Sequence, residues 1–198
     1  MSRAMGRDVR SRLILLAALC ASMLLVHLAN MASGGALSGF GIRPRDPDGL
    51  VGIIAAPWLH GDLGHLGNNL IMLAILGGLC LMDGIAYFVR ASAIIILLSG
   101  VLLWLLGRDA VHIGASGWIF GLWSLVIARA FYHRSYGNIA ISIVVILLYG
   151  GLAWGMLPAG GVSFEGHIFG AVSGLVAAVL LHRRRARQRP AAGPKFWG

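Results

Sequence analysis

Six apolar stretches divide this chain, and they constrain its fold more than any other feature. They cover residues 13–31, 65–82, 85–106, 116–132, 139–157 and 167–181. A helix needs roughly 20 apolar residues to cross the hydrocarbon core of a bilayer, with about 17 to 25 as the usual range. The chain is 58% hydrophobic and only 12% charged, whereas soluble domains carry about 25% charged residues. We therefore predict an all-α membrane protein, a bundle of six transmembrane helices.

The distribution of basic residues predicts how this bundle is oriented. An even number of spans places both ends of the chain on one side of the membrane. Thirteen of the 16 Lys and Arg residues fall on that side, and Arg43, Arg45 and Arg108 fall on the other. Because cytoplasmic segments carry the excess of Lys and Arg, both termini are predicted to be cytoplasmic. This explains the net charge of +9 better than a nucleic-acid partner does.

The same pattern divides the chain into three parts. We expect a cytoplasmic tail at residues 1–12, a membrane domain at 13–182 and a basic, disordered cytoplasmic tail at 183–198. The first apolar stretch exceeds the usual 7 to 15 residues of a signal peptide, so a retained helix is expected. Cys20 and Cys80 lie inside apolar stretches, where packing is expected rather than a disulfide or a zinc site. The loop at 32–64 carries the turn-forming sequence Asp46-Pro47-Asp48-Gly49.

Four polar residues lie at matching depths in separate apolar stretches. Ser116 and His167 each begin a stretch that runs inward from the outer face, and His65 and Asn69 lie at the start of another. A polar side chain in hydrocarbon is costly, so polar groups that share one depth are candidates for one site. His65 and Asn69, four residues apart, share a helix face. Hydrogen bonding between helices would explain that pair equally well.

Ser116 and His167 have the chemistry of a nucleophile and its base. The predicted start of the helix at Ser116 offers unpaired backbone N–H groups that favour an oxyanion. Gly114 and Gly117 would let a substrate backbone approach closely, and Gly170 belongs to a glycine stripe beside His167. Such stripes allow close helix contact, although a stripe alone indicates only packing. The soluble hydrolase motif G-x-S-x-G is not matched, because Trp118 replaces its last glycine.

With these residues assembled, the chain resembles the rhomboid intramembrane serine proteases over residues 13–182. The resemblance is carried by G-x-S-G at Ser116, G-H-x-x-G at His167 and H-x-x-x-N at His65 and Asn69. It implies a dyad of Ser116 as nucleophile and His167 as general base, without an aspartate. It also implies an oxyanion hole made by His65, Asn69 and the backbone N–H of Ser116.

Several residues depart from this pattern or have open roles. Many rhomboids carry a Trp-Arg pair in the first outer loop, but here Leu59 follows Trp58, which puts the shape of that loop and substrate selection in doubt. His60 matches a histidine common in the family, and a solvated loop histidine is an equal alternative. For Glu165 we expect solvation in an outer loop, with tuning of His167 as the alternative, and the role of His112 is open. His27 and Asn30, at the outer end of the first stretch, are expected to serve helix packing or interfacial solvation.

The sequence thus predicts an endopeptidase that cleaves transmembrane segments of membrane-anchored proteins near the outer leaflet, with the lipid bilayer as its medium. The expected location is a bacterial plasma membrane, and no metal or cofactor is expected. A zinc protease would need H-E-x-x-H, which does not occur, and an aspartyl protease would need two carboxylates at depth, whereas Asp83 lies at the end of a stretch. A small transporter and a binding scaffold that does not cut remain alternatives. The sequence does not indicate the oligomeric state.

Overall fold

The computed structural model describes residues 2–132 and 135–188, and within them it is all-helical, with one isolated antiparallel bridge between Ile42 and His112. The long helices are α1 (Ser2–Ala32), α3 (Leu63–Leu81), α4 (Ile85–Leu106), α5 (Ser116–Tyr132), α6 (Tyr136–Tyr149) and α7 (Phe164–Gln188). A 3₁₀ helix, η4 (Gly150–Met156), continues from α6. The predicted all-α class is therefore confirmed for the described residues.

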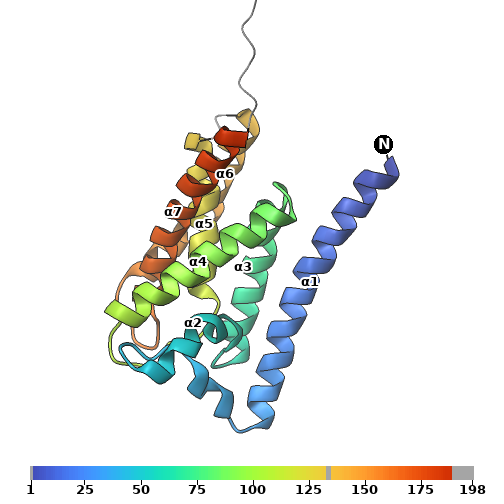
Figure 1. Cartoon of the computed structure of the whole chain (residues 1–198). Helices are drawn as coiled ribbons and strands as arrows, with labels where there is room; N and C mark the ends of the chain where they lie inside the picture. The colour runs from blue at the N-terminus through green and yellow to red at the C-terminus, as the bar shows by residue number, and fades with distance from the viewer. Residues whose placement is uncertain (1, 133–134, 189–198) are drawn as a thin grey trace, which may run out of the picture.

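Five helical segments in the described part of the chain are long and apolar enough to cross a membrane. They are Gly6–Ala32, Leu63–Leu81, Ile85–Leu106, Tyr136–Met156 and Phe164–His182. Helix α5 has 17 residues, the lower limit of the usual range of about 17 to 25, so a sixth span stays a prediction. The start of α1 and the end of α7 lie at the same end of the bundle (Figure 1). That this end is cytoplasmic stays a prediction from the charges, and we name the opposite end the outer end.

Both predicted tails contain helical residues that continue the neighbouring apolar helix. Helix α1 begins at Ser2, and α7 continues to Gln188, so the apolar stretches end well before their helices do. Arg has a high helix propensity, and a helix that is already nucleated extends at little cost. The prediction of disorder from residue 183 is therefore wrong for residues 183–188, and residues 189–198 lie outside the described part.

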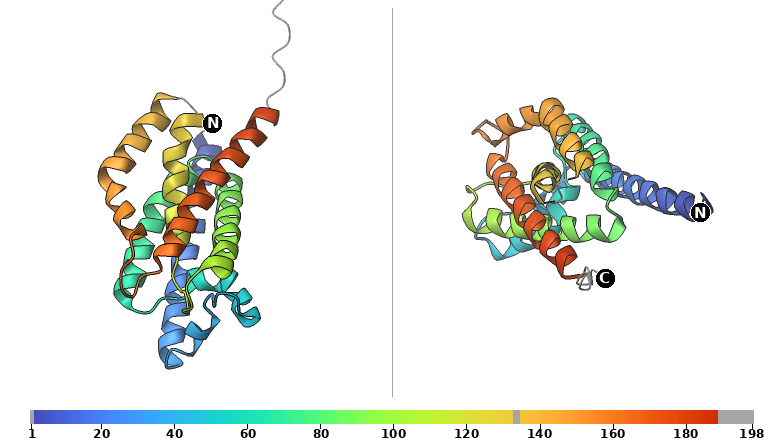
Figure 2. Two further views of the ribbon diagram at one scale, coloured as in Figure 1. Left: turned by 90° about the vertical axis from the view of Figure 1, so that its left-hand side faces the viewer. Right: turned by 90° about the horizontal axis from the view of Figure 1, so that it is seen from above.

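The first outer loop is more ordered than its turn-forming residues suggest. It contains η1 (Ala36–Phe40), η2 (Pro47–Val51), α2 (Gly52–Ala55) and η3 (Ala56–Trp58), which lie together at the outer end (Figures 1 and 2). The carboxylate of Asp46 accepts a hydrogen bond from the backbone N–H of Asp48 at 2.9 Å and so caps η2. This loop connects the outer ends of α1 and α3.

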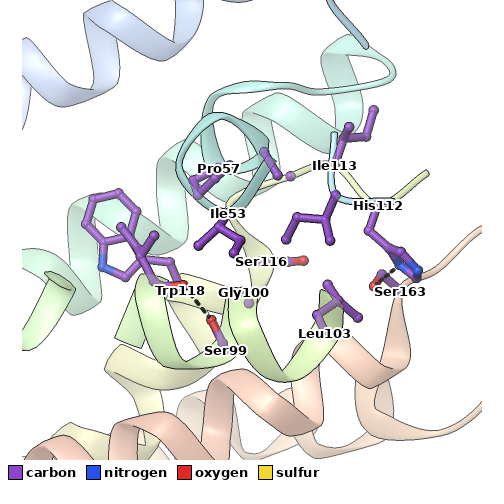
Figure 3. Close-up of a pocket in the computed structure, with 16 residues that line it drawn as sticks. Ile53, Pro57, Ser99, Gly100, Leu103, His112, Ile113, Ser116, Trp118 and Ser163 are labelled. Atoms are coloured by element: carbon purple, nitrogen blue, oxygen red, sulfur yellow. Dashed lines mark hydrogen bonds between the residues drawn. The ribbon is translucent and has the colours of Figure 1, made fainter. Parts of the chain in front are cut away.

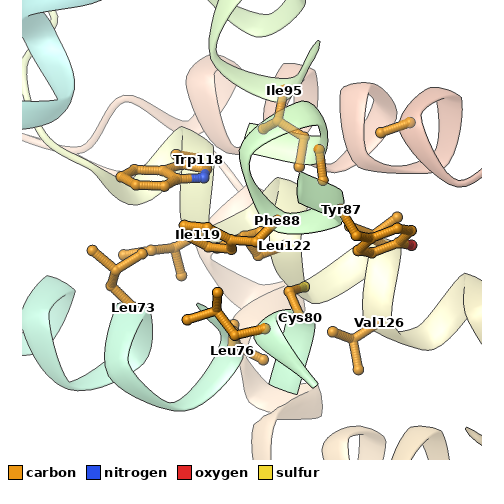
Figure 4. Packing of buried hydrophobic residues seen from close by; sticks show 14 of the residues in the cluster. Leu73, Leu76, Cys80, Tyr87, Phe88, Ile95, Trp118, Ile119, Leu122 and Val126 are labelled. Atoms are coloured by element: carbon orange, nitrogen blue, oxygen red, sulfur yellow. The ribbon is translucent and has the colours of Figure 1, made fainter. Parts of the chain in front are cut away.

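Helix α5 lies at the centre of the bundle, as the view from above shows (Figure 2). Its apolar side chains meet those of α3 and α4 in one buried core (Figure 4). Leu73 and Leu76 of α3, Phe88 of α4, and Leu122 and Val126 of α5 are almost fully buried there. A helix surrounded by others needs apolar residues on most of its faces, which explains why α5 reads as a continuous apolar stretch.

Helices α5 and α7 approach closely enough for their backbones to touch. A Cβ atom at Gly170 would overlap the carbonyl oxygen of Gly117, and one at Gly174 would overlap that of Gly121. Ser124 of α5 also donates a hydrogen bond to the carbonyl of Ala171 at 2.7 Å. Small residues allow this approach between membrane helices. The glycine stripes of α5 and α7 therefore form one shared interface.

Candidate active site

The structure brings Ser116 and His167 together. The hydroxyl oxygen of Ser116 lies 2.8 Å from Nε2 of His167. Ser116 is the first residue of α5 and His167 lies in the first turn of α7, so both side chains occupy the outer end of the closest helix pair in the bundle. The contact that we predicted from their matching depths is present, and the catalytic roles of the two residues stay predictions.

The hydrogen bonds of His167 define which of its nitrogens carries the proton. Its Nδ1 lies 2.7 Å from the carbonyl oxygen of Gly155 in η4. A carbonyl can only accept, so Nδ1 donates and Nε2 is left to accept the hydroxyl proton of Ser116. The ring of Phe120 stacks on the imidazole, with 4.2 Å between centroids and 5° between planes. His167 is thus held in the tautomer and orientation of a base facing Ser116.

Gly114 is placed where only a glycine fits. Its φ angle is +116°, a conformation that residues with a side chain rarely adopt. A Cβ atom there would lie 2.7 Å from Nε2 of His65. The backbone N–H of Gly114 donates to the carbonyl of Ala56 at 2.9 Å, which ties the approach to Ser116 to the first outer loop. The predicted supporting role of Gly114 therefore has a geometric basis, as does that of Gly117 and Gly170 in the helix contact.

His65 and Asn69 line the same cavity as Ser116 and His167. This cavity has a volume of about 680 Å³, and outer-loop residues such as Gly61, Arg108 and Gly161 also line it. Asn69 is buried, and its amide donates to the carbonyl of His65 one turn earlier on α3 at 2.8 Å. The predicted oxyanion donors therefore face the space beside the Ser116 hydroxyl. Their role as donors to a reacting oxygen stays a prediction.

His60 is not a solvated loop residue. Its side chain is 0% exposed, and its ring lies edge-on to His65 with 5.0 Å between centroids. Its Nε2 accepts a long hydrogen bond of 3.4 Å from the backbone N–H of Ala115, the residue before Ser116. Burial, with a smaller contribution from His65, lowers the pKa of His60 to about 4, so the ring stays neutral at ordinary pH. The alternative of a solvated histidine is wrong because the first loop folds inward over this residue.

The two polar residues at the outer end of α1 are buried as well. His27 bonds the carbonyl of His60 at 3.2 Å. Asn30 donates to the hydroxyl of Ser38 at 3.0 Å and accepts from the backbone N–H of the same serine at 3.2 Å. Of the two expected roles, helix packing is therefore the correct one, because both side chains join α1 to the first loop.

His112, Ser163 and Glu165 form polar contacts at the rim of the cavity. Nδ1 of His112 lies 2.7 Å from the hydroxyl of Ser163, and the pair lies near Ser116 (Figure 3). Glu165 forms an ion pair of 3.1 Å with Arg108, and only 13% of its side chain is exposed. The expectation that Glu165 is solvated is wrong, because Arg108 from the α4–α5 loop covers it.

Sequence reasoning missed Phe120, Ser163 and the carbonyl of Gly155. Phe120 could have been found, because it lies four residues after Ser116 and so shares its helix face. Ser163 could have been found only from its spacing. It lies four residues before His167, and His112 lies four residues before Ser116. Any residue can supply a backbone carbonyl, so no side-chain signal pointed to Gly155.

The site contains the chemical groups that acyl transfer requires. A hydroxyl faces a base of fixed tautomer, the base is held by a carbonyl and an aromatic ring, and donors line the adjacent cavity. These are the parts that a serine nucleophile needs. An aspartate partner for the histidine is absent among the residues that the structure describes around this ring, where the carbonyl of Gly155 takes that place.

Comparisons with known proteins identify the family of the chain. A family model described as the rhomboid domain matches residues 47–184. An uncharacterized protein of Mycobacterium tuberculosis is 42% identical over 187 residues, covering 88% of this chain and 78% of that protein. One of Mycobacterium leprae is 36% identical over 185 residues, covering 87% and 73%. The RHOMBOID-like protein 4 of Arabidopsis thaliana is 33% identical over 139 residues, covering 66% of this chain and 34% of the plant protein. Because the rhomboid family model matches more than half of its residues, this chain belongs to the rhomboid family.

Proposed function

We propose that this protein is an intramembrane serine endopeptidase that uses a dyad of Ser116 and His167. The observation that carries the proposal is the 2.8 Å contact between the Ser116 hydroxyl and Nε2 of His167, in a tautomer fixed by Gly155. Membership of the rhomboid family supports it. A hydrogen bond to a base is the usual means by which a protein activates a serine.

The reaction follows from this geometry. The Ser116 oxygen attacks the carbonyl carbon of a peptide bond while Nε2 of His167 takes the hydroxyl proton. The same nitrogen then returns the proton to the leaving amine as the C–N bond breaks, leaving an ester on Ser116. Water, deprotonated by His167, hydrolyses that ester and restores the free hydroxyl.

The negative charge that develops on the carbonyl oxygen needs donors in the cavity. The backbone N–H of Ser116 is unpaired within its helix because it begins α5. His65 and Asn69 supply further donors from α3. Removing one such donor costs about 2.7 to 4 kcal/mol of transition-state stabilisation in serine proteases. Asn69→Ala is therefore expected to slow cleavage by about a hundredfold or more.

The position of the cavity suggests the class of substrate. The dyad lies in the first turns of α5 and α7, and residues of the outer loops line its cavity. A transmembrane segment could reach it only by unwinding there, since a helix hides its own peptide bonds. We therefore propose membrane-anchored proteins as substrates, cut near the outer leaflet of a bacterial plasma membrane.

Cleavage of a transmembrane reporter in reconstituted vesicles tests this function. Ser116→Ala should abolish cleavage, whereas Ser173→Ala should leave it unchanged, because the Ser173 hydroxyl bonds the carbonyl of Phe169 within its own helix at 2.7 Å. Circular dichroism and thermal unfolding should show that both variants remain folded. Equal cleavage by the parent and Ser116→Ala would reject the dyad.

Two outcomes would favour the alternatives from the sequence. Solute uptake by vesicles that is unchanged in Ser116→Ala would favour a transporter. Retention of the reporter without cleavage by the parent would favour a scaffold.

A further inference from the structure

A second serine–histidine contact lies in the two non-helical segments that lead into α5 and α7. His112 precedes Ser116 by four residues, and Ser163 precedes His167 by four. The 2.7 Å contact between His112 and Ser163 is therefore a second contact between the same two chain segments. Here the histidine lies before α5 and the serine before α7, the reverse of the dyad. Figure 3 shows the pair beside Ser116.

The proton positions in this second contact are defined by a backbone carbonyl. Nε2 of His112 lies 3.1 Å from the carbonyl oxygen of Arg108. The carbonyl can only accept, so Nε2 donates and Nδ1 accepts the hydroxyl proton of Ser163. His112 is 3% exposed, and a hydrogen bond at a buried site is costly to remove, because the remaining partner stays unpaired.

Arg108 strengthens the same connection between the two loops. Its guanidinium forms the 3.1 Å ion pair with Glu165, donates to the carbonyl of Val162 and lies over the ring of Phe164 with 5.3 Å to the centroid. Because 41% of the Arg108 side chain is exposed, we expect the ion pair to contribute less than the bond between Ser163 and the buried His112. We call Arg108, His112, Ser163 and Glu165 the loop clasp.

The location of the loop clasp matters because the dyad lies near helix ends. First turns of helices lack part of their hydrogen bonding and tend to fray. Inward of the dyad, α5 and α7 are fixed by backbone contact at Gly117 and Gly170. Outward of the dyad, among the described residues, the loop clasp joins the α4–α5 loop to the segment that begins α7. The bridge between Ile42 and His112 and the bond from Gly114 to Ala56 tie the α4–α5 loop to the first outer loop, and the clasp adds its direct connection to the segment that carries His167.

We propose that the loop clasp positions the dyad, and that His112 and Ser163 are its principal positioning residues. This inference rests on the proposed function of Ser116 and His167. His112 and Ser163 act through the two loops rather than on the substrate. Their loss lets the first turns of α5 and α7 move relative to each other while the glycine interface keeps the bundle folded.

The first test is the rate at which a fluorophosphonate labels Ser116 in detergent. Ser163→Ala should lower this rate about tenfold, as expected for one buried hydrogen bond. Ser163→Thr keeps the hydroxyl and should restore most of the rate. The double variant of His112→Ala and Ser163→Ala should be no slower than the slower single variant, because both remove the same contact. Ser173→Ala is the matched control and should label like the parent. In reporter cleavage the loss should fall on kcat with KM nearly unchanged.

The second test, hydrogen exchange, needs no activity. Ser163→Ala should raise amide exchange in residues 107–115, although the substitution lies in the other loop, and Ser163→Thr should not. Unchanged exchange in residues 107–115, an unchanged labelling rate in Ser163→Ala, or failure of Ser163→Thr to restore the rate would each overturn the proposal. If the parent itself is not labelled at Ser116, the proposed function fails and the positioning role fails with it. Exchange then still reports whether the two loops are joined.

Discussion

Helices α5 and α7 pack more closely than helices α1 and α3. The closely packed pair carries the proposed dyad, whose two side chains must stay at a fixed distance, and the loosely packed pair does not. Between α5 and α7 the backbones touch at Gly117 and Gly170. Between α1 and α3 a groove of about 200 Å³ remains, lined by residues such as Leu13 and Leu81. The distance between α1 and the other helices grows toward the N-terminal end of α1 (Figure 1). Direct backbone contact between α5 and α7 holds the proposed dyad in place. Helix α1 is held by side-chain packing and a few hydrogen bonds.

The largest effect is expected when one methyl group is added to each of these two interfaces. Gly170→Ala would place a Cβ on the carbonyl oxygen of Gly117, so the helices must separate, and we expect a loss of about 3 kcal/mol in stability. Reporter cleavage should fall with it, because the distance between Ser116 and His167 grows. Gly78→Ala in α3 is the matched control, since its Cβ would lie 3.9 Å from Leu16 of α1, an ordinary contact. Thermal unfolding of both variants in detergent measures the difference, and equal loss in both would contradict it.

The next largest effect is expected where the α4–α5 loop meets His65. In Gly114→Ala the new Cβ would lie 2.7 Å from Nε2 of His65 and push the ring out of the cavity, so we expect labelling of Ser116 to slow about a hundredfold. Gly84→Ala is the control: Gly84 also has a positive φ, of +102°, but its Cβ would meet nothing within 4 Å. Both variants carry similar backbone strain. Slow labelling in both would assign the effect to strain and not to His65.

The first loop, which joins α1 to the site, should make stability depend on pH. The pKa of His60 is about 4 in the folded protein against 6.5 for an ordinary histidine. The unfolded chain therefore binds the proton first as pH falls, so stability is full above about pH 6.5 and is lost toward pH 4. The loss at pH 5 should reach about 2 kcal/mol. His60→Gln should remove this part of the pH dependence when unfolding is followed at pH 8 and pH 5, and an unchanged dependence would refute the assignment.

The smallest effect is expected at the attachment of α1 itself. Ser22 accepts a hydrogen bond from the indole N–H of Trp58 in the first loop at 2.9 Å, so Ser22→Ala should cost about 1 kcal/mol. Ser11→Ala, on the same helix, should cost less, because the Ser11 hydroxyl is exposed and bonds the carbonyl of Arg7 in its own helix. The Tm values of the two variants compare them. A larger loss in Ser11→Ala would mean that α1 is held mainly at its N-terminal end.

The contrast between these regions also explains what the sequence could predict. Ser116 and His167 could be paired because polar residues stand out in apolar stretches, and the glycine stripes indicated that the two helices could approach. The partner of His167 could not be predicted, since the carbonyl of Gly155 has no residue signature. The burial of His60 could not be predicted either, because it depends on how the first loop folds over it. The helices that begin at Ser2 and end at Gln188 extend beyond the apolar stretches. Hydropathy indicates which residues lie in the membrane, and it does not indicate where a helix begins or ends.

Labelling with a fluorophosphonate shows whether Ser116 is a nucleophile that His167 activates. Peptide mapping by mass spectrometry should find the phosphonyl group on Ser116 in the parent protein. His167→Ala should lose the label while remaining folded, because it removes the base that contacts the Ser116 hydroxyl at 2.8 Å. A label that persists at Ser116 in His167→Ala, or a folded parent that takes no label at Ser116, would contradict the account.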